Sequence, residues 1–499
     1  MSSQPSRPTP SGPSTSRPGA TPLEERARRV RFRRAVSLMA MTLVAPGTAQ
    51  MAAGNRRVGL VAFRTWLTVL AVGAVLAVAV LLDHGLALSL GTSTLLLFWL
   101  KAFLLVGAVA WAVLLVDAWR IGQPLSYGLG HRRAAVGING ILCFSVAGTL
   151  LFGAHLVGVQ RDFMLAMFGD GQASAAAHGR YNVLLMGGDS GAGRWGLRPD
   201  SLTVASIDEV TGKTVLVGLP RNMKNFPFAE GSVMAEQFPD GFDADYLNGV
   251  YTWALDHTEL FEGSDDPGTD ATIMAVEGIT GLDINYWAMV NLQGFKDLVD
   301  AVGGVKLTVR QPIPVGLPSD DFFHYLEPGT RTLSGFDTLW YARARYDSDD
   351  YSRMARQKCV MNAMLQQVSP TRMLQNFERI TKASAAMVST SVPRSEVDTF
   401  VDLALKAKSQ KVATLSLVPP LVNTGDPDVD LIHDKVAEVI AKSEGRVEKA
   451  STGSAGSSDA AKKARRAKKK AASSVTGGSL GSLSEGYTAN DTEDLGTAC

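Results

Sequence analysis

Cysteine and histidine are scarce in this chain, and their scarcity argues against several kinds of site. Three cysteines and seven histidines occur among the 499 residues, and the histidines lack the spacing of zinc ligands. No Gly-x-Ser-x-Gly segment and no Cys-His pattern is present, so the sequence offers no nucleophile for acyl transfer. The glycine-rich turn at residues 187–196, GGDSGAGRWG, lacks the Lys-Ser/Thr of a P-loop. The net charge of +1 by itself indicates no class of partner.

Apolar runs, by contrast, are long enough to cross a membrane three times. Spans are predicted at Thr65–Leu82, Leu95–Val116 and Ala134–Val159, each near the roughly 20 residues that a bilayer requires. The loop between the first two spans has no Lys or Arg, whereas the next loop contains Arg120, Arg132 and Arg133. Because positive residues stay in the cytoplasm, we expect a multi-pass plasma-membrane protein whose amino terminus is inside. Everything after Val159 is then extracytoplasmic.

Residues 1–64 are expected to form a disordered, basic cytoplasmic arm with an interfacial segment. Residues 1–22 are rich in Ser, Pro, Thr and Gly, and six arginines follow between Arg26 and Arg34. Such a run can bind nucleic acid, but beside membrane spans it more often retains the segment in the cytoplasm, so no nucleic-acid partner is expected. The apolar stretch Ser37–Ala53 contains Pro46, Gly47 and Gln50, and we interpret it as interfacial or re-entrant.

The remainder of the chain is predicted to be an α/β domain between two polar segments. A linker is expected at 160–180, the domain at 181–444 and a low-complexity, basic tail at 445–499. Strand and helix patterns alternate within the domain, which predicts a layered α/β/α arrangement around a central, mostly buried sheet. Strands are expected at 181–186, 202–207, 214–219, 286–291, 305–309 and 412–418, and helices at 271–279, 292–302, 334–343, 351–367, 397–408 and 428–442.

Charged side chains follow the first strands of this domain. Asp189, Arg198 and Asp200 lie in the turn after the first strand, and Arg221 follows the third. A second block, LWYARARYDSDDYSRMARQ at residues 339–357, contains the arginines and glutamine Arg343, Arg345, Arg353, Arg356 and Gln357, the last three on one helix face. Carboxylates suit a hard cation such as Mg²⁺, and guanidinium groups match phosphate oxygens. The two blocks together therefore predict a site for a metal and a phosphate.

These blocks resemble the LytR-CpsA-Psr family of bacterial cell-wall enzymes. The resemblance covers about residues 181–442 and follows five motifs in order: NVLLMGGDS, the R-x-D of Arg198 and Asp200, the L-P-R of Arg221, GFKDLVDAVGGVKL, and Y-A-R-A-R with R-x-x-R-Q. Asn222 stands where Asp commonly follows the Pro-Arg, a departure that an actinobacterial branch shares and that puts an acidic base there in doubt.

The resemblance implies a membrane-anchored phosphotransferase. It would move a glycopolymer from a polyprenyl-pyrophosphate carrier to peptidoglycan through a phosphodiester bond, with arabinogalactan or a comparable wall glycan as the polymer. Asp189 and Asp200 would hold Mg²⁺ or Mn²⁺, and four arginines would clamp the phosphates: Arg198, Arg221, Arg343 and Arg345. Arg353, Gln357 and Asn222 are further substrate-binding candidates. The general base is left open: Asp189 and Asp200 are the nearest candidates, ahead of Asp349 and Asp350. The lipid tail would lie in an apolar tunnel between the sheet and helices such as 292–302 and 351–367.

Two other functions remain open. In a polyprenyl-pyrophosphate pyrophosphatase, water would replace the sugar hydroxyl at the same site. In a non-catalytic protein, the domain would only hold the lipid-linked precursor, or act as a regulatory attenuator.

The cysteines lead to a further expectation. Cys143 falls in the third span, whereas Cys359 and Cys499 both fall in the exported part of the chain, where disulfides are permitted. We predict a bridge between Cys359 and Cys499; the alternative is a buried free Cys359 and an untethered chain end.

Overall fold

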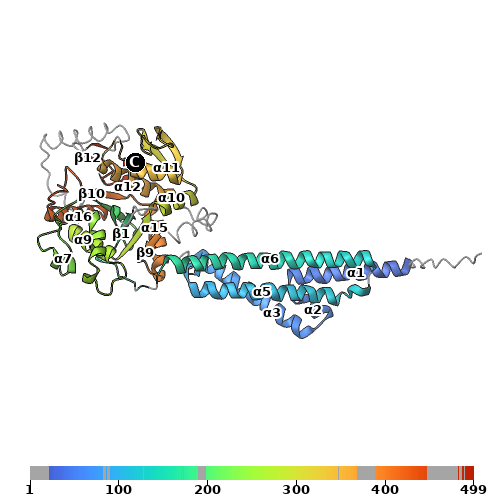
Figure 1. Ribbon diagram of the computed structural model, residues 1–499. Coiled ribbons are helices and arrows are strands. Elements are labelled where there is room, and N and C mark those ends of the chain that lie inside the picture. The colour runs from blue at the N-terminus through green and yellow to red at the C-terminus, as the bar shows by residue number, and fades with distance from the viewer. Residues whose placement is uncertain are drawn as a thin grey trace, which may run out of the picture. The chain divides into compact units, whose positions relative to one another are not determined.

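The computed structural model describes residues 22–82, 86, 90–126, 128–169, 171, 173–188, 198–346, 348–367, 388–446, 481–482, 486–487 and 489–499. The chain divides into two compact units. The helical unit comprises Met1–His84 and Phe98–Gly158, and the sheet-containing unit comprises Gly85–Leu97 and Val159–Cys499 (Figure 1). Each unit is described by itself below.

Three helices in the described part of the chain are long and apolar enough to cross a membrane. They are α3 (Arg56–Leu82), α5 (Thr94–Ile121) and the Leu129–Leu165 part of α6 (Leu129–Met167), which agrees with the three predicted spans. Two further helices precede them, α1 (Pro22–Val44) and α2 (Thr48–Ala53), and a short 3-10 turn, η1 (Pro124–Ser126), separates α5 from α6.

The expectation of disorder up to residue 64 is wrong from Pro22 onward, because α1 is a continuous helix through the arginine run. Arg, Leu, Ala, Met and Glu dominate this segment, and all are good helix formers. Its apolar half also buries Leu38 and Met39 against Ala49 and Ala118. The apolar stretch Ser37–Ala53 is split between α1 and α2, and Gly47 at the break has a φ of 95°.

The predicted linker is also shorter than expected, since α6 continues to Met167. Residues 160–167, QRDFMLAM, contain no Gly or Pro and are compatible with a helix. Gln160 donates a hydrogen bond through Nε2 to the Gly91 carbonyl over 3.1 Å. The segment that follows reaches the sheet through an isolated bridge between Ala177 and Arg180.

A seven-stranded mixed sheet forms the centre of the second unit, in the order β13-β10-β3-β2-β1-β4-β9. Strands β1 and β4 pair in parallel, as do β3 and β10, and the other neighbours are antiparallel. The strands are β1 (Arg180–Gly188), β2 (Pro199–Asp208), β3 (Thr214–Leu219), β4 (Tyr286–Asn291), β9 (Val388–Thr390), β10 (Ala413–Ser416) and β13 (Asp491–Thr492).

Helices cover both faces of this sheet, which confirms the predicted layered α/β/α class. Val215 and Val217 of β3 pack with α8 (Val250–Asp256), α9 (Pro267–Thr280) and α16 (Val429–Ser443). Leu216 lies between them in sequence, therefore points to the opposite face, and packs with Ala355 of α12 (Asp350–Gln367). The same unit contains the shorter helical segments α7 (Val233–Gln237), η2 (Leu247–Gly249), η3 (Thr258–Leu260), η4 (Arg394–Glu396), α15 (Val397–Lys408) and α18 (Leu495–Ala498).

A smaller lobe is inserted between β4 and α12. Two antiparallel strand pairs form it, β5 (Val305–Val309) with β8 (Gly329–Leu333) and, between them in the chain, β6 (Ile313–Val315) with β7 (His324–Leu326). Helices α10 (Leu292–Ala301) and α11 (Gly335–Arg343) share its core with Val360 of α12. The lobe and the sheet therefore meet along α12.

The carboxyl-terminal residues are part of the fold, contrary to the expectation of a low-complexity tail over 445–499. Residues 489–499 form β13 and α18, and Leu495 and Ala498 are buried beside Cys359. The structure joins Cys359 to Cys499 by a disulfide. Two short strands, β11 (Gly481–Ser482) and β12 (Gly486–Tyr487), precede this segment, and the basic part of the predicted tail lies outside the described residues. The apolar residues near the end explain the docking, because burying them favours an ordered segment.

Candidate functional site

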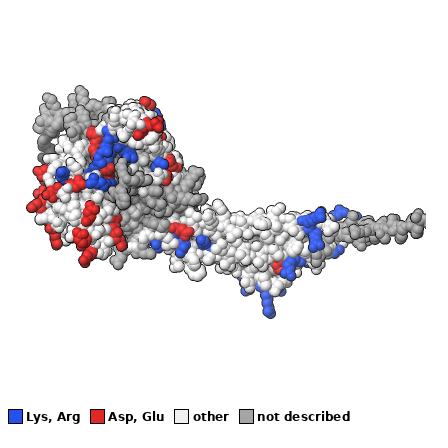
Figure 2. Space-filling view, viewed as in Figure 1, with Lys and Arg blue, Asp and Glu red and all other residues white. Residues whose placement is uncertain are grey.

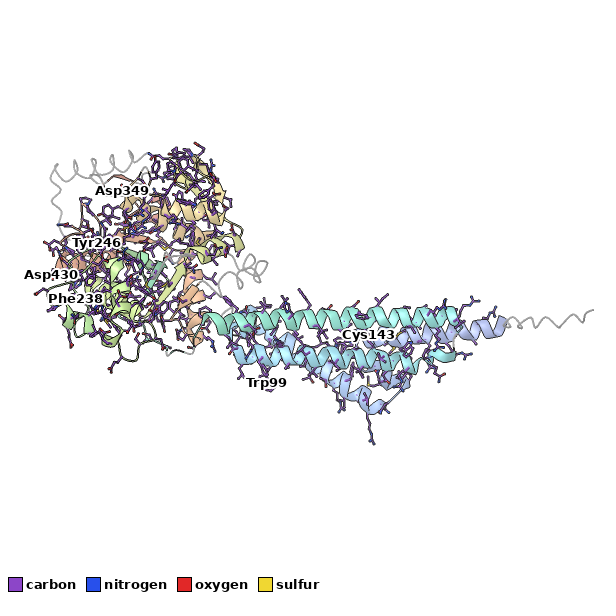
Figure 3. The ribbon with its side chains drawn as sticks, in the orientation of Figure 1. Trp99, Cys143, Phe238, Tyr246, Asp349 and Asp430 are labelled. Carbon is purple, nitrogen blue, oxygen red and sulfur yellow. A yellow bond between two sulfur atoms is a disulfide. The ribbon has the colours of Figure 1, made fainter. Side chains whose placement is uncertain are left out.

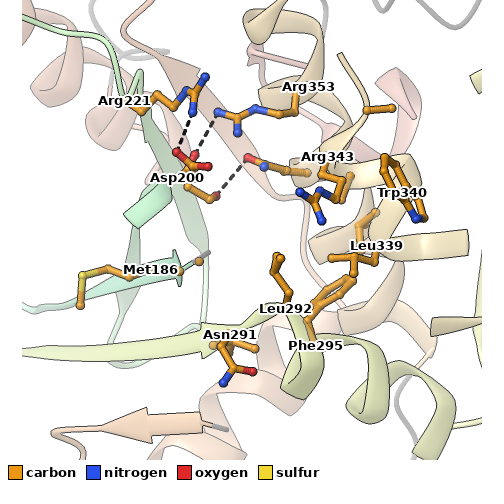
Figure 4. Close-up of a pocket in the computed structure, with 18 of the residues that line it drawn as sticks. Met186, Asp200, Arg221, Asn291, Leu292, Phe295, Leu339, Trp340, Arg343 and Arg353 are labelled. Carbon is orange, nitrogen blue, oxygen red and sulfur yellow. Dashed lines mark hydrogen bonds and ion pairs between the residues drawn. The ribbon is translucent and has the colours of Figure 1, made fainter. Parts of the chain in front are cut away.

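A cavity of about 900 Å³ lies between the sheet and the small lobe. Figure 4 shows its two kinds of lining: arginines with Asp200 in one part, and apolar side chains such as Leu292 and Phe295 in another. Helices α10, α11 and α12 contribute to its lining, and the sequence placed a possible tunnel between the sheet and two of them, α10 and α12.

The pairing of the first three strands brings the charged residues of the first sequence block together. Gly187 near the end of β1 lies opposite Ser201 near the start of β2, and Leu202 lies opposite Leu219 at the end of β3. Asp200 and Arg221 therefore lie at the same edge of the sheet, although 21 residues separate them. Figure 2 shows Lys and Arg side chains gathered in one area of this unit, with Asp and Glu along its margins.

Arg221 and Asp200 form the central ion pair of the site. Arg221 Nη1 donates to Asp200 Oδ1 over 2.7 Å, and Asn248 Nδ2 approaches the same oxygen at 3.4 Å. Burial acts to raise the pKa of Asp200, but the hydrogen bond and charge of Arg221, with Arg353 and Asn248, outweigh it and lower that pKa. Burial likewise acts to lower the pKa of Arg221, and its two carboxylate neighbours reverse the direction. Both side chains are therefore charged near neutral pH.

Asp350 connects three of the arginines. Its carboxylate lies 3.4 Å from Arg221 Nε, 3.8 Å from Arg345 Nη1 and 3.1 Å from Arg353 Nη2. One carboxylate at the start of α12 thus holds guanidinium groups from three different segments. From the sequence, Asp350 was only a less favoured candidate for the general base, and this bridging position was not predicted.

Two hydrogen bonds join the first turns of α12 to the start of β2. Arg353 Nη2 donates to the Asp200 carbonyl over 2.9 Å, and the Ser201 hydroxyl donates to Gln357 Oε1 over 3.0 Å. Burial lowers the pKa of Arg353, and the charge of Asp350 opposes this. Arg353 Nε is buried without a hydrogen-bond partner among the described residues.

The two remaining cavity arginines and Arg198 are less enclosed. Arg343 lies over the Trp340 ring, 5.0 Å from its centroid. Arg345 is half exposed. Arg198 Nη2 donates to Asp245 Oδ2 over 2.5 Å, and both side chains are largely accessible. All of these arginines line the cavity and can reorient toward an anion there.

Asn222 and Asp189 are the predicted site residues that the structure does not place in the cavity. Asn222 is absent from the cavity lining, and its Oδ1 is buried without a partner among the residues that the structure describes. Asp189 lies outside those residues. Within them, no group of three or more His, Cys, Asp or Glu residues could hold a metal ion. Asp200 is thus the one predicted metal ligand that the structure places in the cavity.

The sequence analysis missed several lining residues. Asn248 comes from η2, and Asp245, the partner of Arg198, precedes it in an acidic loop. Neither follows a predicted strand, so no sequence signal pointed to them. The apolar lining combines three groups: Leu292, Phe295 and Leu298 of α10; Val360, Met361 and Met364 of α12; and Leu185, Ala288 and Val290 of the sheet. The sheet and the helices at 292–302 and 351–367 were expected to border the tunnel, but the individual side chains that line it were not predicted.

This geometry can be compared with known proteins. Residues 160–429, more than half of the chain, match the sequence model of the LytR_cpsA_psr family. The chain belongs to the LytR-CpsA-Psr family. The cavity, with Asp200 and the arginines of both motif blocks in its lining, lies within the matched region.

Three curated relatives are 26% to 28% identical to this chain over the segments that align. It is 28% identical over 316 residues to the cell wall biosynthesis protein LcpA of Corynebacterium glutamicum, covering 56% of this chain and 59% of that protein. It is 26% identical over 218 residues to the polyisoprenyl-teichoic acid–peptidoglycan teichoic acid transferase TagU of Bacillus cereus, covering 43% and 62%. It is 26% identical over 263 residues to biofilm regulatory protein A of Streptococcus mutans, covering 51% and 60%. The chain thus spans about 60% of the length of these relatives.

Two solved structures are similar to part of this chain. The crystal structure of TagV from B. subtilis covers 53% of this chain and 96% of its own, with 22% identity and a TM-score of 0.38. A protein of Streptococcus agalactiae, gbs0355, covers 52% and 88%, with 22% identity and a TM-score of 0.40.

Proposed function

We propose that this protein is a phosphotransferase that moves a glycopolymer from a polyprenyl-pyrophosphate carrier to peptidoglycan through a phosphodiester bond. One observation carries the proposal: a single cavity has arginines and a carboxylate in one part and aliphatic and aromatic side chains in the rest. A molecule that fills both parts carries phosphate groups on a long apolar chain. The name of the B. cereus relative, a teichoic acid transferase acting on a polyisoprenyl-linked polymer, supports the same class of donor.

The arginines would bind and stabilise the phosphates. Arg221, Arg343, Arg345 and Arg353 come from three segments, so they can surround a pyrophosphate from more than one side. Negative charge on the phosphoryl oxygens shifts during transfer, and fixed cations in a partly buried site lower the barrier. Asp350 holds the guanidinium groups in place before the donor arrives, which reduces the reorganisation needed for catalysis.

The apolar part would hold the prenyl chain. The volume of the whole cavity, about 900 Å³, lies at the upper end of the range for small-molecule sites. Each buried methylene contributes about 0.8 kcal/mol. A prenyl chain of even moderate length thus gains enough from burial to bind while its phosphates face the arginines.

A divalent metal, Mg²⁺ or Mn²⁺, is part of this proposal. Asp200 fits such an ion as one carboxylate ligand, because Mg²⁺ commonly takes one or two carboxylates and completes its shell with substrate phosphate oxygens and water. Asp189 would be the second carboxylate. When bound, the ion would supply positive charge to the phosphate oxygens. The acceptor would be a sugar hydroxyl of peptidoglycan, and arabinogalactan or a similar wall glycan would be the polymer transferred.

The location required by these substrates is the outer face of the plasma membrane. The three apolar helices indicate a membrane anchor. With the amino terminus in the cytoplasm, three spans would place the site outside. Reporter fusions after Leu82 and after Val159 should both report an external location, and a fusion near Gly122 an internal one. An internal signal after Val159 would remove the site from peptidoglycan and refute the proposal.

A turnover assay separates transfer from the two alternatives. The full chain in nanodiscs is given a lipid-linked glycan donor, Mg²⁺ and peptidoglycan fragments, and release of polyprenyl phosphate is measured together with glycan on the acceptor. Transfer predicts both products in equal amounts. Release of polyprenyl phosphate without acceptor labelling indicates a pyrophosphatase, and donor binding without release indicates a holding or regulatory protein.

A further inference from the structure

Two phenylalanines of the small lobe are exposed next to the cavity. Phe322 is 48% exposed and Phe336 is 36% exposed, and their rings lie 5.5 Å apart. Both also contact Trp340, with centroid distances of 6.1 and 6.4 Å. We call Phe322 and Phe336 the aromatic surface. Leaving two phenyl rings in water forgoes the stabilisation that burial would bring, so this surface calls for a ligand.

The aromatic surface is continuous with the phosphate-binding part of the cavity. Trp340 lines the cavity and carries the Arg343 guanidinium 5.0 Å from its ring centroid. Gly316, another lining residue, lies beneath the Phe322 ring, where an added Cβ would come within 2.8 Å of Phe322 Cε2. The Trp340 ring therefore lies between a phosphate bound by Arg343 and the aromatic surface.

Polar groups with hydrogen-bonding capacity surround the two rings. The same hypothetical Cβ on Gly316 would lie 3.2 Å from Asp320 Oδ2, so this carboxylate is beside Phe322. Asp337 directly follows Phe336 in the sequence, and its Oδ1 lies 3.9 Å from His324 Nε2. Carboxylates and an imidazole accept hydrogen bonds from hydroxyl groups. The combination of an aromatic face and a polar border suits an uncharged, hydroxyl-rich ligand with an apolar side.

We propose that the aromatic surface is a glycan subsite, which binds the sugar attached to the donor pyrophosphate. This inference rests on the proposed function. A sugar bonded to a phosphate on Arg343 must lie next to it, and the aliphatic C–H groups of a sugar ring pack against the electron-rich face of an aromatic ring. Asp320 and Asp337 accept from its hydroxyl groups. The Trp340 ring lies between the phosphate and the aromatic surface and sets the distance between the two.

Charge favours a sugar over a lipid surface as the occupant. Three carboxylates, Asp320, Asp321 and Asp337, lie in the two segments that carry Phe322 and Phe336. Inserting them into a bilayer would cost desolvation free energy, and anionic headgroups would repel them. Sugar hydroxyls, by contrast, are hydrogen-bond donors that carboxylates bind in water.

The test compares probes that differ only in the sugar. The full chain in nanodiscs is titrated with a ten-carbon prenyl pyrophosphate and with the same compound carrying one N-acetylglucosamine or one galactose. The ratio of the dissociation constants without and with sugar measures the sugar contribution. We expect a ratio of roughly five to ten for at least one sugar, the size of one or two aromatic contacts.

Variants locate this contribution. Phe322→Ala with Phe336→Ala should reduce the ratio to about 1 and leave binding of the sugar-free probe unchanged, because neither ring lines the cavity. Phe322→Tyr with Phe336→Tyr should keep the ratio, since both aromatic faces remain. Leu405→Ala on α15, where Leu405 is 43% exposed, is the matched apolar control and should change neither constant.

Three results would overturn the glycan subsite. The wild type could show no sugar contribution, the double Ala variant could keep it, or that variant could lose affinity for both kinds of probe equally, as a lipid-docking surface would. Failure of the wild type to bind the sugar-free probe would have a different meaning, because it would refute the pyrophosphate site of the proposed function itself.

Discussion

The Arg356 guanidinium donates a hydrogen bond to the carbonyl oxygen of Ala344, the residue between Arg343 and Arg345. Its Nε also donates to the Tyr341 carbonyl over 2.8 Å. Arg356 is 1% exposed, and burial lowers its pKa to about 10, so it is charged at neutral pH. A buried cation on α12 thus fixes the backbone that carries two arginines of the site.

Replacing Arg356 with Met should therefore lower both stability and turnover. Two buried carbonyl groups would lose their donor, each at a cost of about 1 to 3 kcal/mol. Arg356→Lys should be intermediate, because an ammonium group can reach one of the carbonyls but cannot bridge both. Urea unfolding and the turnover assay measure the two effects. Wild-type turnover in Arg356→Met would show that the Arg343–Arg345 segment needs no such support.

The central ion pair gives the second prediction. Arg221→Ala should slow transfer by about 100-fold or more, by analogy with the ~2.7 to 4 kcal/mol lost with one preorganised donor to a reacting oxygen. Asp200→Asn should weaken the dependence of the rate on Mg²⁺ concentration as well. Arg331→Ala is the matched control, since Arg331 is an exposed arginine of β8 outside the cavity lining. Near wild-type rates in any two of Arg198→Ala, Arg221→Ala, Arg343→Ala and Arg345→Ala would refute the proposed phosphate site.

Lys358 predicts a pH dependence of stability. Its Nζ is fully buried, donates to the Ser416 hydroxyl over 2.5 Å and to the Leu415 carbonyl over 3.2 Å, and burial lowers its pKa to about 7. In the unfolded chain this pKa is near 10.4, so between about pH 7 and pH 10 the unfolded state binds a proton that the folded state does not. The free energy of unfolding should therefore rise with pH in this window, by at most about 1.4 kcal/mol per pH unit from this group.

Urea unfolding of the full chain between pH 7 and pH 9.5 measures this slope. Lys358→Met should flatten it, because the variant has no amine to titrate. Lys306→Met, at an exposed position of β5, should retain the wild-type slope. Equal slopes in wild type and Lys358→Met would mean that the amine titrates alike in the folded and unfolded chains.

The disulfide provides the last prediction. Cys359 and Cys499 are 140 residues apart, and in the chain-entropy model a loop of that length stabilises the fold by about 5 kcal/mol at most. Cys499→Ser should lower the free energy of unfolding toward the value measured for wild type in a reductant. Cys143→Ser is the control, since Cys143 is a free cysteine of α6 in the helical unit (Figure 3). If Cys359 and Cys499 in exported protein both alkylate without reductant, as mass spectrometry would show, this stabilisation is absent.

Much of the sheet-containing unit could be read from the sequence because its elements are regular. The bounds of β3, β4, β5 and α15 agree with the predicted ranges, since each has a clear apolar pattern ended by Gly, Pro, Asn or a charged residue. Strands β6 and β7 were not predicted. Each has only three residues, too few for a period of two to show.

The charged part of the site was predictable only in outline. The arginines come directly after strands or lie three to four residues apart on one helix face, and both placements predict that they lie close together. The bridging role of Asp350 could not be predicted in this way, because it depends on Arg221, from a segment distant in the sequence, reaching the same carboxylate as Arg345 and Arg353. The helical α1 escaped prediction for another reason: its arginines resemble a solvated arm until the helix packs Met39 against Ala49 and Ala118.

The position of β13 in the sheet has a consequence for biosynthesis. Strand β13 pairs with β10, and the Asn490 side chain accepts from Ser416 and donates to the Tyr351 carbonyl beside Lys358 and Cys359. The ribosome adds about 5 to 20 residues per second, so Cys359 exists for roughly 10 to 30 seconds before Cys499, 140 residues later, is made. During that interval the nascent chain carries an unpaired thiol and an open sheet edge. The newly made chain is therefore at its most vulnerable to mispairing and proteolysis before residues 489–499 arrive.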